Sequence, residues 1–201
     1  MSNSHEKKQI GRPKTLNRQS VIEKSMHTYW EAGLQHISLN DVCRINDISK
    51  PSFYREFGGE DGLIDSVVDH YSQIWLTPIE DILRKVRPFK EGLNAYLSYV
   101  TNPAQFPHGC LVVNMLDDID RLGPESQRRL TSLQAKNRQL YRDWVQRGQR
   151  NHEIRSDIEI SELVYFIEVQ FLTVSRHVAK KDSPSLICRQ AQIAFESLFL
   201  K

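Results

Sequence analysis

The chain has 201 residues, the length of one ordinary domain or two small ones. Of these residues 26% are charged, and no apolar stretch approaches the roughly 20 residues that span a bilayer, so we expect no membrane segment and a cytoplasmic protein. Three cysteines without CxxC or Cys/His ligand spacing argue against a disulfide framework and a zinc site, so we expect neither metal nor cofactor.

Positive charge is concentrated at the start of the chain. Residues 1–58 hold nine Lys or Arg against six Asp or Glu, whereas residues 59–201 hold eighteen against nineteen. The densest basic stretch, residues 7–14, precedes the first predicted helix. We expect residues 1–16 to form a flexible basic arm, which either contacts a polyanion or is only a solvated tail.

Three helices are predicted next in the chain. Asn17 caps the first, whose apolar residues recur at spacings of three and four until Gly33 ends it. Ser38, with an acidic residue three positions later, caps a second helix over residues 39–45. Ser49 caps the third, which carries a proline in its first turn and stops at a glycine pair.

The remainder of the chain has helical periodicity throughout. A long connecting helix is predicted over residues 60–86, with a bend at Pro78. Turn signals built on proline, glycine, asparagine and serine separate the segments that follow. They predict helices at 90–101, 110–122, 124–150, 158–180 and 184–200. No segment has the pattern of a strand, so the predicted fold class is all-α.

The second and third helices have the arrangement of a helix-turn-helix, because both are short and about three residues separate them. The sequence there reads Leu39-x-x-Val42-Cys43-x-x-Asn46-Asp47-Ile48-Ser49-Lys50-Pro51-Ser52-Phe53-Tyr54-x-x-Phe57-x-x-x-x-x-Leu63. This motif resembles the signature of the TetR family of transcriptional repressors. The resemblance implies a DNA-binding domain over residues 17–60 and a helical ligand-binding and dimerisation domain over residues 61–201.

The resemblance also implies which side chains face DNA. Phe53 and Phe57 pack back onto the first two helices. Lys50 and Arg55 can neutralise phosphates or reach a guanine edge. The Tyr54 hydroxyl can bond a phosphate, with a buried structural tyrosine as the alternative, and the basic arm either enters the minor groove or follows the phosphates. The residues expected to contact DNA are Arg12, Lys14, Ser38, Ser49, Lys50, Ser52, Tyr54 and Arg55.

Three positions depart from the family pattern. Asp47 stands in the turn where a glycine is usual; aspartate adopts left-handed backbone but adds a negative charge near DNA. Glu60 replaces a lysine that meets a phosphate, and it complements the helix dipole instead. Pro51 removes one backbone N–H that could bond a phosphate.

A symmetric operator is bound by a dimer, so a self-complementary surface is required. The resemblance implies a homodimer in which the last two helices pair with those of a second copy. The apolar residues on these helices include Leu163, Phe166, Ile167, Phe171, Val174, Leu186, Ile187, Ile193, Ala194, Leu198 and Phe199. Whether they form the interface or close the core of a single chain is left open by the sequence.

A repressor needs a switch, so we expect the middle helices to enclose a pocket for a small-molecule inducer. Residues 109–114, Gly-Cys-Leu-x-x-Asn, resemble a stretch found in a subset of TetR-like proteins. Cys110 is interpreted as a small residue that allows close helix packing; the alternative is a sensor of electrophiles or oxidants, for which the helix N-terminus and the nearby His108 predict a lowered thiol pKa. The candidate ligand or sensor residues, several of them equally suited to the core, are Cys110, His108, Asn114, Trp75, Tyr96, Phe106, Tyr141, Trp144 and His177.

These patterns predict a TetR-like regulator, a repressor that binds a palindromic operator as a dimer through helix 49–57 and is released by a small molecule or an electrophile. A DNA-bound adaptor that recruits a protein partner without a small-molecule ligand is the alternative. The sequence contains no nucleotide-binding loop, no GxSxG and no HExxH, so no enzymatic activity is expected.

Overall fold

Side-chain caps set the start of the three N-terminal helices. In the computed structural model, which describes residues 16–199, these helices are α1 (Arg18–Ala32), α2 (Leu39–Asn46) and α3 (Lys50–Phe57). The side chain of each predicted cap accepts a hydrogen bond from the backbone N–H three residues later, at Asn17, Ser38 and Ser49. A short 3-10 turn, η1 (Leu34–His36), lies between α1 and α2.

Left-handed backbone ends α2 and sets the angle between the two helices of the helix-turn-helix. Asp47 adopts φ 52° and ψ 47°, and its N–H donates to the carbonyls of Cys43 and Arg44. The family's glycine is therefore replaced by a residue that adopts the same conformation, as the sequence predicts.

One long helical run leaves the N-terminal helices. It consists of α4 (Glu60–Tyr71), the π-helical turn η2 (Ser72–Leu76) and α5 (Thr77–Arg84). The predicted irregularity at Pro78 takes the form of this π-turn, because proline has no N–H to continue the α-helical ladder.

The remaining helices differ from their predicted bounds at two places. They are α6 (Phe89–Val100), α7 (Leu111–Leu116), η3 (Ile119–Arg121), α8 (Pro124–Arg150), α9 (Ile160–Ala179), α10 (Pro184–Phe195) and η4 (Glu196–Leu198). The predicted helix 110–122 is wrong beyond residue 116, where the Gln127 amide binds the carbonyls of Ile119 and Leu122. The predicted helix 184–200 ends early because the carbonyl of Leu198 accepts from the backbone N–H of Arg155.

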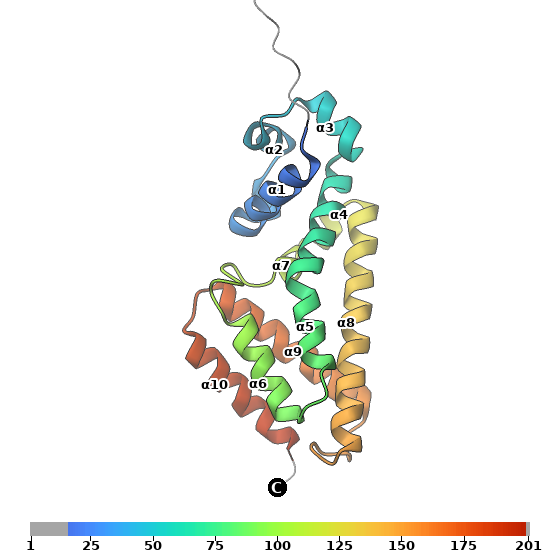
Figure 1. The fold of residues 1–201 in the computed structure, drawn as a ribbon, viewed down its shortest axis with the longest axis vertical. Helices are drawn as coiled ribbons and strands as arrows, with labels where there is room; N and C mark the ends of the chain where they lie inside the picture. Colours follow the sequence, from blue (N-terminus) through green and yellow to red (C-terminus); the bar gives the residue numbers. More distant parts are fainter. Residues whose placement is uncertain (1–15, 200–201) are drawn as a thin grey trace, which may run out of the picture.

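The arrangement of these helices separates two parts of the molecule (Figure 1). Helices α1, α2 and α3 form a head at one end, and the run α4–α5 leads from the head into a body built from α5 to α10. In the body α8 packs along α4 and α5 on one side and against α9 on the other, and α10 packs on α9. A continuous buried core joins head and body. Within residues 16–199 no helix is both long and apolar enough to cross a membrane.

Candidate functional site

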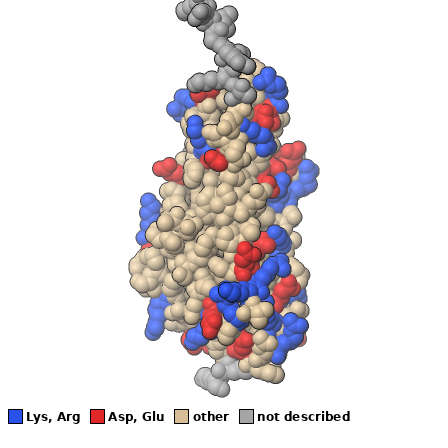
Figure 2. Space-filling view, viewed as in Figure 1, with Lys and Arg blue, Asp and Glu red and all other residues tan. Residues whose placement is uncertain are grey.

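Helix α3 presents a polar outer face while two phenylalanines hold its inner face. Phe53 and Phe57 are buried in the core with residues of α1, α2 and α4, as predicted. Lys50 and Arg55 are exposed, and neither has an ion-pair partner within residues 16–199. Tyr54 is 52% exposed, so the alternative of a buried structural tyrosine is wrong. Figure 2 shows Lys and Arg side chains, with some acidic ones among them, at this end of the molecule.

The predicted serines serve as caps around the turn. The hydroxyl of Ser38 accepts from the Asp41 N–H, and the carboxylate of Asp41 accepts from the Ser38 backbone N–H at 3.1 Å, which completes a capping box on α2. The Ser38 hydroxyl also donates to this carboxylate, at 2.6 Å. These contacts with Ser38, followed by those with Arg44, lower the pKa of Asp41 to about 2. Ser49 is exposed at the start of α3, where its hydroxyl lies 3.0 Å from that of the half-buried Ser52. The predicted contacts Arg12 and Lys14 lie outside the described residues.

Arg18, which the sequence analysis did not single out, holds α3 in place. Its guanidinium donates to the Ser66 hydroxyl of α4 at 2.8 Å, lies 3.4 Å from the carboxylate of Glu56 and stacks 5.3 Å from the centroid of the Phe57 ring. One side chain of α1 therefore contacts both α3 and α4. No local sequence pattern reveals this bracing role.

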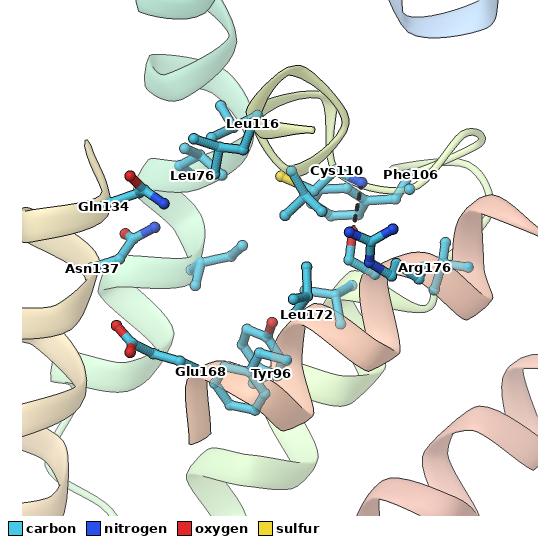
Figure 3. A pocket seen from close by; sticks show the side chains of 18 of the residues that line it. Leu76, Tyr96, Phe106, Cys110, Leu116, Gln134, Asn137, Glu168, Leu172 and Arg176 are labelled. Carbon is cyan, nitrogen blue, oxygen red and sulfur yellow. Dashed lines mark hydrogen bonds between the residues drawn. The ribbon is translucent and has the colours of Figure 1, made fainter. Parts of the chain in front are cut away.

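A cavity of about 330 Å³ lies in the body between α5, α6, α7, α8 and α9. Four of the nine predicted ligand or sensor residues line it: Tyr96, Phe106, Cys110 and Tyr141. Figure 3 shows the hydroxyl of Tyr96 pointing into the space that Cys110 and Phe106 border from the opposite side. The volume is within the range of small-molecule sites in proteins.

The other five candidates lie elsewhere. Trp144 is fully buried and stacks on Phe89 with ring centroids 3.9 Å apart. Trp75 packs its ring against Tyr71 in the core, and His177 is exposed, with its Nδ1 2.6 Å from a carboxylate oxygen of Asp182. His108 and Asn114 line a separate hollow between α1 and α7. Their assignment to one pocket is wrong because helical spacing does not reveal which neighbour covers each face.

The predicted lowering of the Cys110 pKa is also wrong. Burial raises the pKa of this thiol, and the hydrogen bonds that the N–H of Val113 and the Tyr71 hydroxyl direct at the sulfur offset only part of the effect. The ring of His108 lies beside Trp30, with the centroids 6.4 Å apart. Cys110 is therefore a thiol of the cavity wall at neutral pH.

Polar residues at the cavity edge were missed by the sequence analysis. The guanidinium of Arg138 on α8 makes a bidentate pair with the carboxylate of Glu168 on α9, at 2.8 and 3.0 Å. Arg176 pairs with Asp117 at 2.7 Å. The amide side chains Gln134 and Asn137 extend from α8 toward the cavity (Figure 3). In the sequence, the polar pattern around these residues is typical of solvent-exposed helix faces. The tertiary packing of the helices brings the residues together at the cavity edge.

The segment that carries Cys110 contacts the head directly. The indole Nε1 of Trp30 on α1 donates to the carbonyl of Gly109 at 2.8 Å, and this contact is buried. Gly109 adopts φ 73°, and a Cβ there would lie 2.7 Å from the carbonyl oxygen of Ser175 on α9. The Tyr71 hydroxyl accepts from the N–H of Leu111 at 3.2 Å. The segment that forms part of the cavity wall is therefore also in direct contact with the head.

Within residues 16–199 no group of three His, Cys, Asp or Glu side chains is placed to hold a metal ion. The site therefore consists of an exposed helical face and a cavity, linked by the Trp30 contact.

Comparisons with known proteins agree with this arrangement. Residues 83–187 match the family model described as the tetracyclin repressor-like C-terminal domain. The HTH-type transcriptional repressor ComR of Escherichia coli (strain K12) is 23% identical over 175 residues, which cover 84% of this chain and 83% of that protein.

Solved structures share the fold at low sequence identity. A cysteine variant of the TetR family transcriptional regulator CifR, complexed with 26-base-pair double-stranded operator DNA, superposes with a TM-score of 0.78 at 23% identity, over 94% of this chain and 100% of that one. The reduced form of NemR from E. coli gives a TM-score of 0.76 at 14% identity, over 92% of this chain and 97% of that one.

Proposed function

Because the chain belongs to the TetR family of transcriptional regulators, we propose that it is a dimeric repressor that binds a palindromic operator through α3. In this proposal a small molecule that fills the body cavity releases the protein from DNA. Residues 1–16 act as a basic arm, residues 17–60 bind DNA, and residues 61–201 bind the ligand and dimerise. The exposed cations Lys50 and Arg55, which have no ion-pair partner among residues 16–199, support the DNA-binding role of α3.

Exposed apolar side chains on α9 and α10 support the dimer. Tyr165, Val169 and Leu172 follow one another at spacings of four and three on α9, and are 68%, 39% and 40% exposed. Leu186 and Ile193 of α10 are 55% and 53% exposed. Such a contiguous apolar face is costly in water, and a second copy of the same face would cover it. Two heads held about 34–36 Å apart would meet successive turns of the major groove.

The observation that carries the proposed switch is the contact between Trp30 and Gly109. A ligand against Phe106 and Cys110 would press on the segment that Gly109 joins to the head. The ring of Trp30 also packs against Tyr71 and Phe106, with centroids 5.2 and 6.4 Å away. A ligand that prefers one position of this segment would bias the position of α1, and with it the position of α3.

An electrophile that adds to Cys110 is a second candidate trigger. The observation in its favour is that the thiol borders the cavity and receives hydrogen bonds from Tyr71 and Val113, which would stabilise a thiolate once formed. A Cys110→Ser variant should keep operator binding and lose any response to electrophiles. An unchanged response in that variant would contradict this trigger.

The proposal is tested with the purified full chain and duplex fragments from its own genome at low ionic strength. We expect retardation of a few fragments that contain a palindrome, and their release by a compound that raises the Tm of the protein. A chain that binds DNA but is stabilised by no compound of a broad screen would support the adaptor alternative. Failure to retard any fragment would contradict the regulator proposal, and turnover of a bound compound would contradict the absence of enzymatic activity.

A further inference from the structure

Two tyrosines with buried rings line the cavity, and neither hydroxyl has a hydrogen-bond partner in the described part of the chain. Tyr96 of α6 and Tyr141 of α8 are only 6% and 9% exposed. Both rings pack on Phe171 of α9, with centroids 3.7 and 5.4 Å away, so both side chains are held in place. By contrast, the hydroxyl of the buried Tyr71 accepts from the N–H of Leu111. Neither hydroxyl is among the fully enclosed unpaired atoms of the described residues, so both are open to the space of the cavity, where a ligand can accept a hydrogen bond from each.

These hydroxyls are hydrogen-bond donors throughout the physiological pH range. Burial raises the pKa of Tyr96, and its closeness to Tyr141 and Cys110 raises it further. Burial likewise raises the pKa of Tyr141. Two phenol groups that keep their protons and line the same cavity can each donate to an acceptor oxygen, which has two lone pairs.

The charged residues of the lining cancel one another. Arg138 is paired with Glu168, and Arg176 with Asp117. The two pairs leave the lining without net charge, and a charged ligand would leave its own charge among the aromatic rings, which is unfavourable. Apart from the uncharged polar side chains of Gln134, Asn137 and Ser175, the rest of the wall is apolar, including Phe106 and the aliphatic residues of α5 and α7. The lining therefore favours a neutral ligand.

The volume of the cavity indicates the size of that ligand. Its 330 Å³ is about twice the roughly 150 Å³ of an engineered apolar cavity that accepts one benzene molecule. A molecule of two fused rings is the corresponding size, and Phe171 with the two tyrosine rings offers flat surfaces to it.

We propose that the cavity binds a neutral two-ring molecule through a carbonyl oxygen that accepts hydrogen bonds from Tyr96 and Tyr141. This inference rests on the proposed function only in taking the bound molecule to be the effector. The binding itself involves residues of the body alone.

The test uses three probes of one size on the full chain: tetralone, which has a carbonyl, tetralin, which lacks it, and naphthoate, which carries a negative charge. Calorimetry should show tetralone binding about 2- to 10-fold more tightly than tetralin, the factor that a hydrogen bond contributes, and naphthoate more weakly than either. In Tyr96→Phe and Tyr141→Phe, tetralone should lose most of this advantage while tetralin binds as before. Tyr99→Phe is the matched control, since its hydroxyl already donates to the carbonyl of Trp75 outside the cavity.

Equal affinities for tetralone and tetralin, no tetralone binding at all, or phenylalanine variants that bind tetralone like the unmodified chain would each overturn the proposal. Because phenylalanine keeps the ring that packs on Phe171, both variants should fold, and the Tm of each checks this. Operator retardation is measured on the same preparations. Tetralone binding without release of DNA would leave the ligand class intact and contradict the effector role, whereas loss of all DNA binding would contradict the proposed function alone.

Discussion

Adjacent residues of α3 serve opposite purposes. Phe53 is fully buried and Tyr54 beside it is 52% exposed, because successive side chains on a helix point about 100° apart. The spacing of Phe53 and Phe57 was enough to predict that both pack inward. Spacing could not decide the environment of Tyr54, because a tyrosine is common both in the core and on the surface. The packing of α1 and α2 on one side of α3 decides it.

Replacing Lys50 by alanine should weaken operator binding without unfolding the protein. If Lys50 contacts a phosphate, the affinity should fall for all duplexes alike and the slope of log affinity against log salt should drop by about one. Fluorescence anisotropy at several salt concentrations measures this, with Lys85→Ala, an exposed lysine at the far end of α5, as the control. Unchanged affinity in both Lys50→Ala and Tyr54→Ala would remove α3 as the DNA-contacting face.

Cys110 should react slowly with iodoacetamide at neutral pH, because burial raises its pKa and the thiolate is the reactive form. The rate should increase as pH rises beyond the ordinary value of about 9 and stay below that of free glutathione at each pH. Mass spectrometry of the peptide that contains Cys110 follows the modification. Rapid labelling at pH 6 would indicate a stabilised thiolate and favour the electrophile trigger.

At the scale of elements, α4 and α8 are joined by their polar side chains as well as by the core. The carboxylate of Asp61 accepts from the N–H groups of Glu125 and Ser126 at 2.8 and 3.0 Å, so a residue of α4 caps α8. Gly123 makes this approach possible, because a Cβ there would lie 2.3 Å from the Asp61 side chain. One turn into α8, Arg129 pairs with carboxylates of α4. The helix that lines the cavity is thus attached to the helix that carries the head.

The Asp61→Ala substitution should lower the free energy of unfolding by about 1–2 kcal/mol, the effect of losing a helix cap. Burial opposes ionisation of Asp61, but its hydrogen bonds with Ser126 and Glu125 leave its pKa below the ordinary 3.8. Its contribution is therefore present above that value and lost as the pH falls below it.

Urea unfolding at pH 7 and pH 3 measures this contribution. Asp81→Ala, which removes an exposed carboxylate of α5, serves as the control. A difference between Asp61→Ala and the unmodified chain that stays the same at both pH values would contradict the capping role.

The division of apolar residues between core and surface determines which face a second copy of the chain could cover. The apolar residues of α9 that are buried within the chain include Leu163, Ile167 and Phe171. The sequence analysis left open whether these residues belong to the core or to the interface. The exposed face of α9 is formed instead by Tyr165, Val169 and Leu172, which the sequence analysis did not select. A helix that is apolar on most of its circumference gives no sign of which side a partner covers.

If the chain dimerises through this face as proposed, introducing glutamate at Tyr165 and Ile193 together should produce a monomer, because the charges would be buried in the interface. Light scattering measures the mass, and operator affinity should fall at least about 10-fold when only one head binds. Val86→Glu is the control, since Val86 is 85% exposed but lies in the loop between α5 and α6. A double variant that remains dimeric would place the interface elsewhere.

Local sequence patterns were enough to predict the class of fold, most helix starts and the inward side of α3, because caps, glycines and apolar spacing act over a few residues of one helix. The left-handed backbone of Asp47 was predicted for the same reason, because it depends on the residues of one turn. Tertiary structure alone decided that Tyr96, Phe106, Cys110 and Tyr141 share a cavity while Trp144 and His177 do not, and that the thiol has a raised pKa. These properties depend on which helices meet and how much water they exclude, and no single segment contains that information.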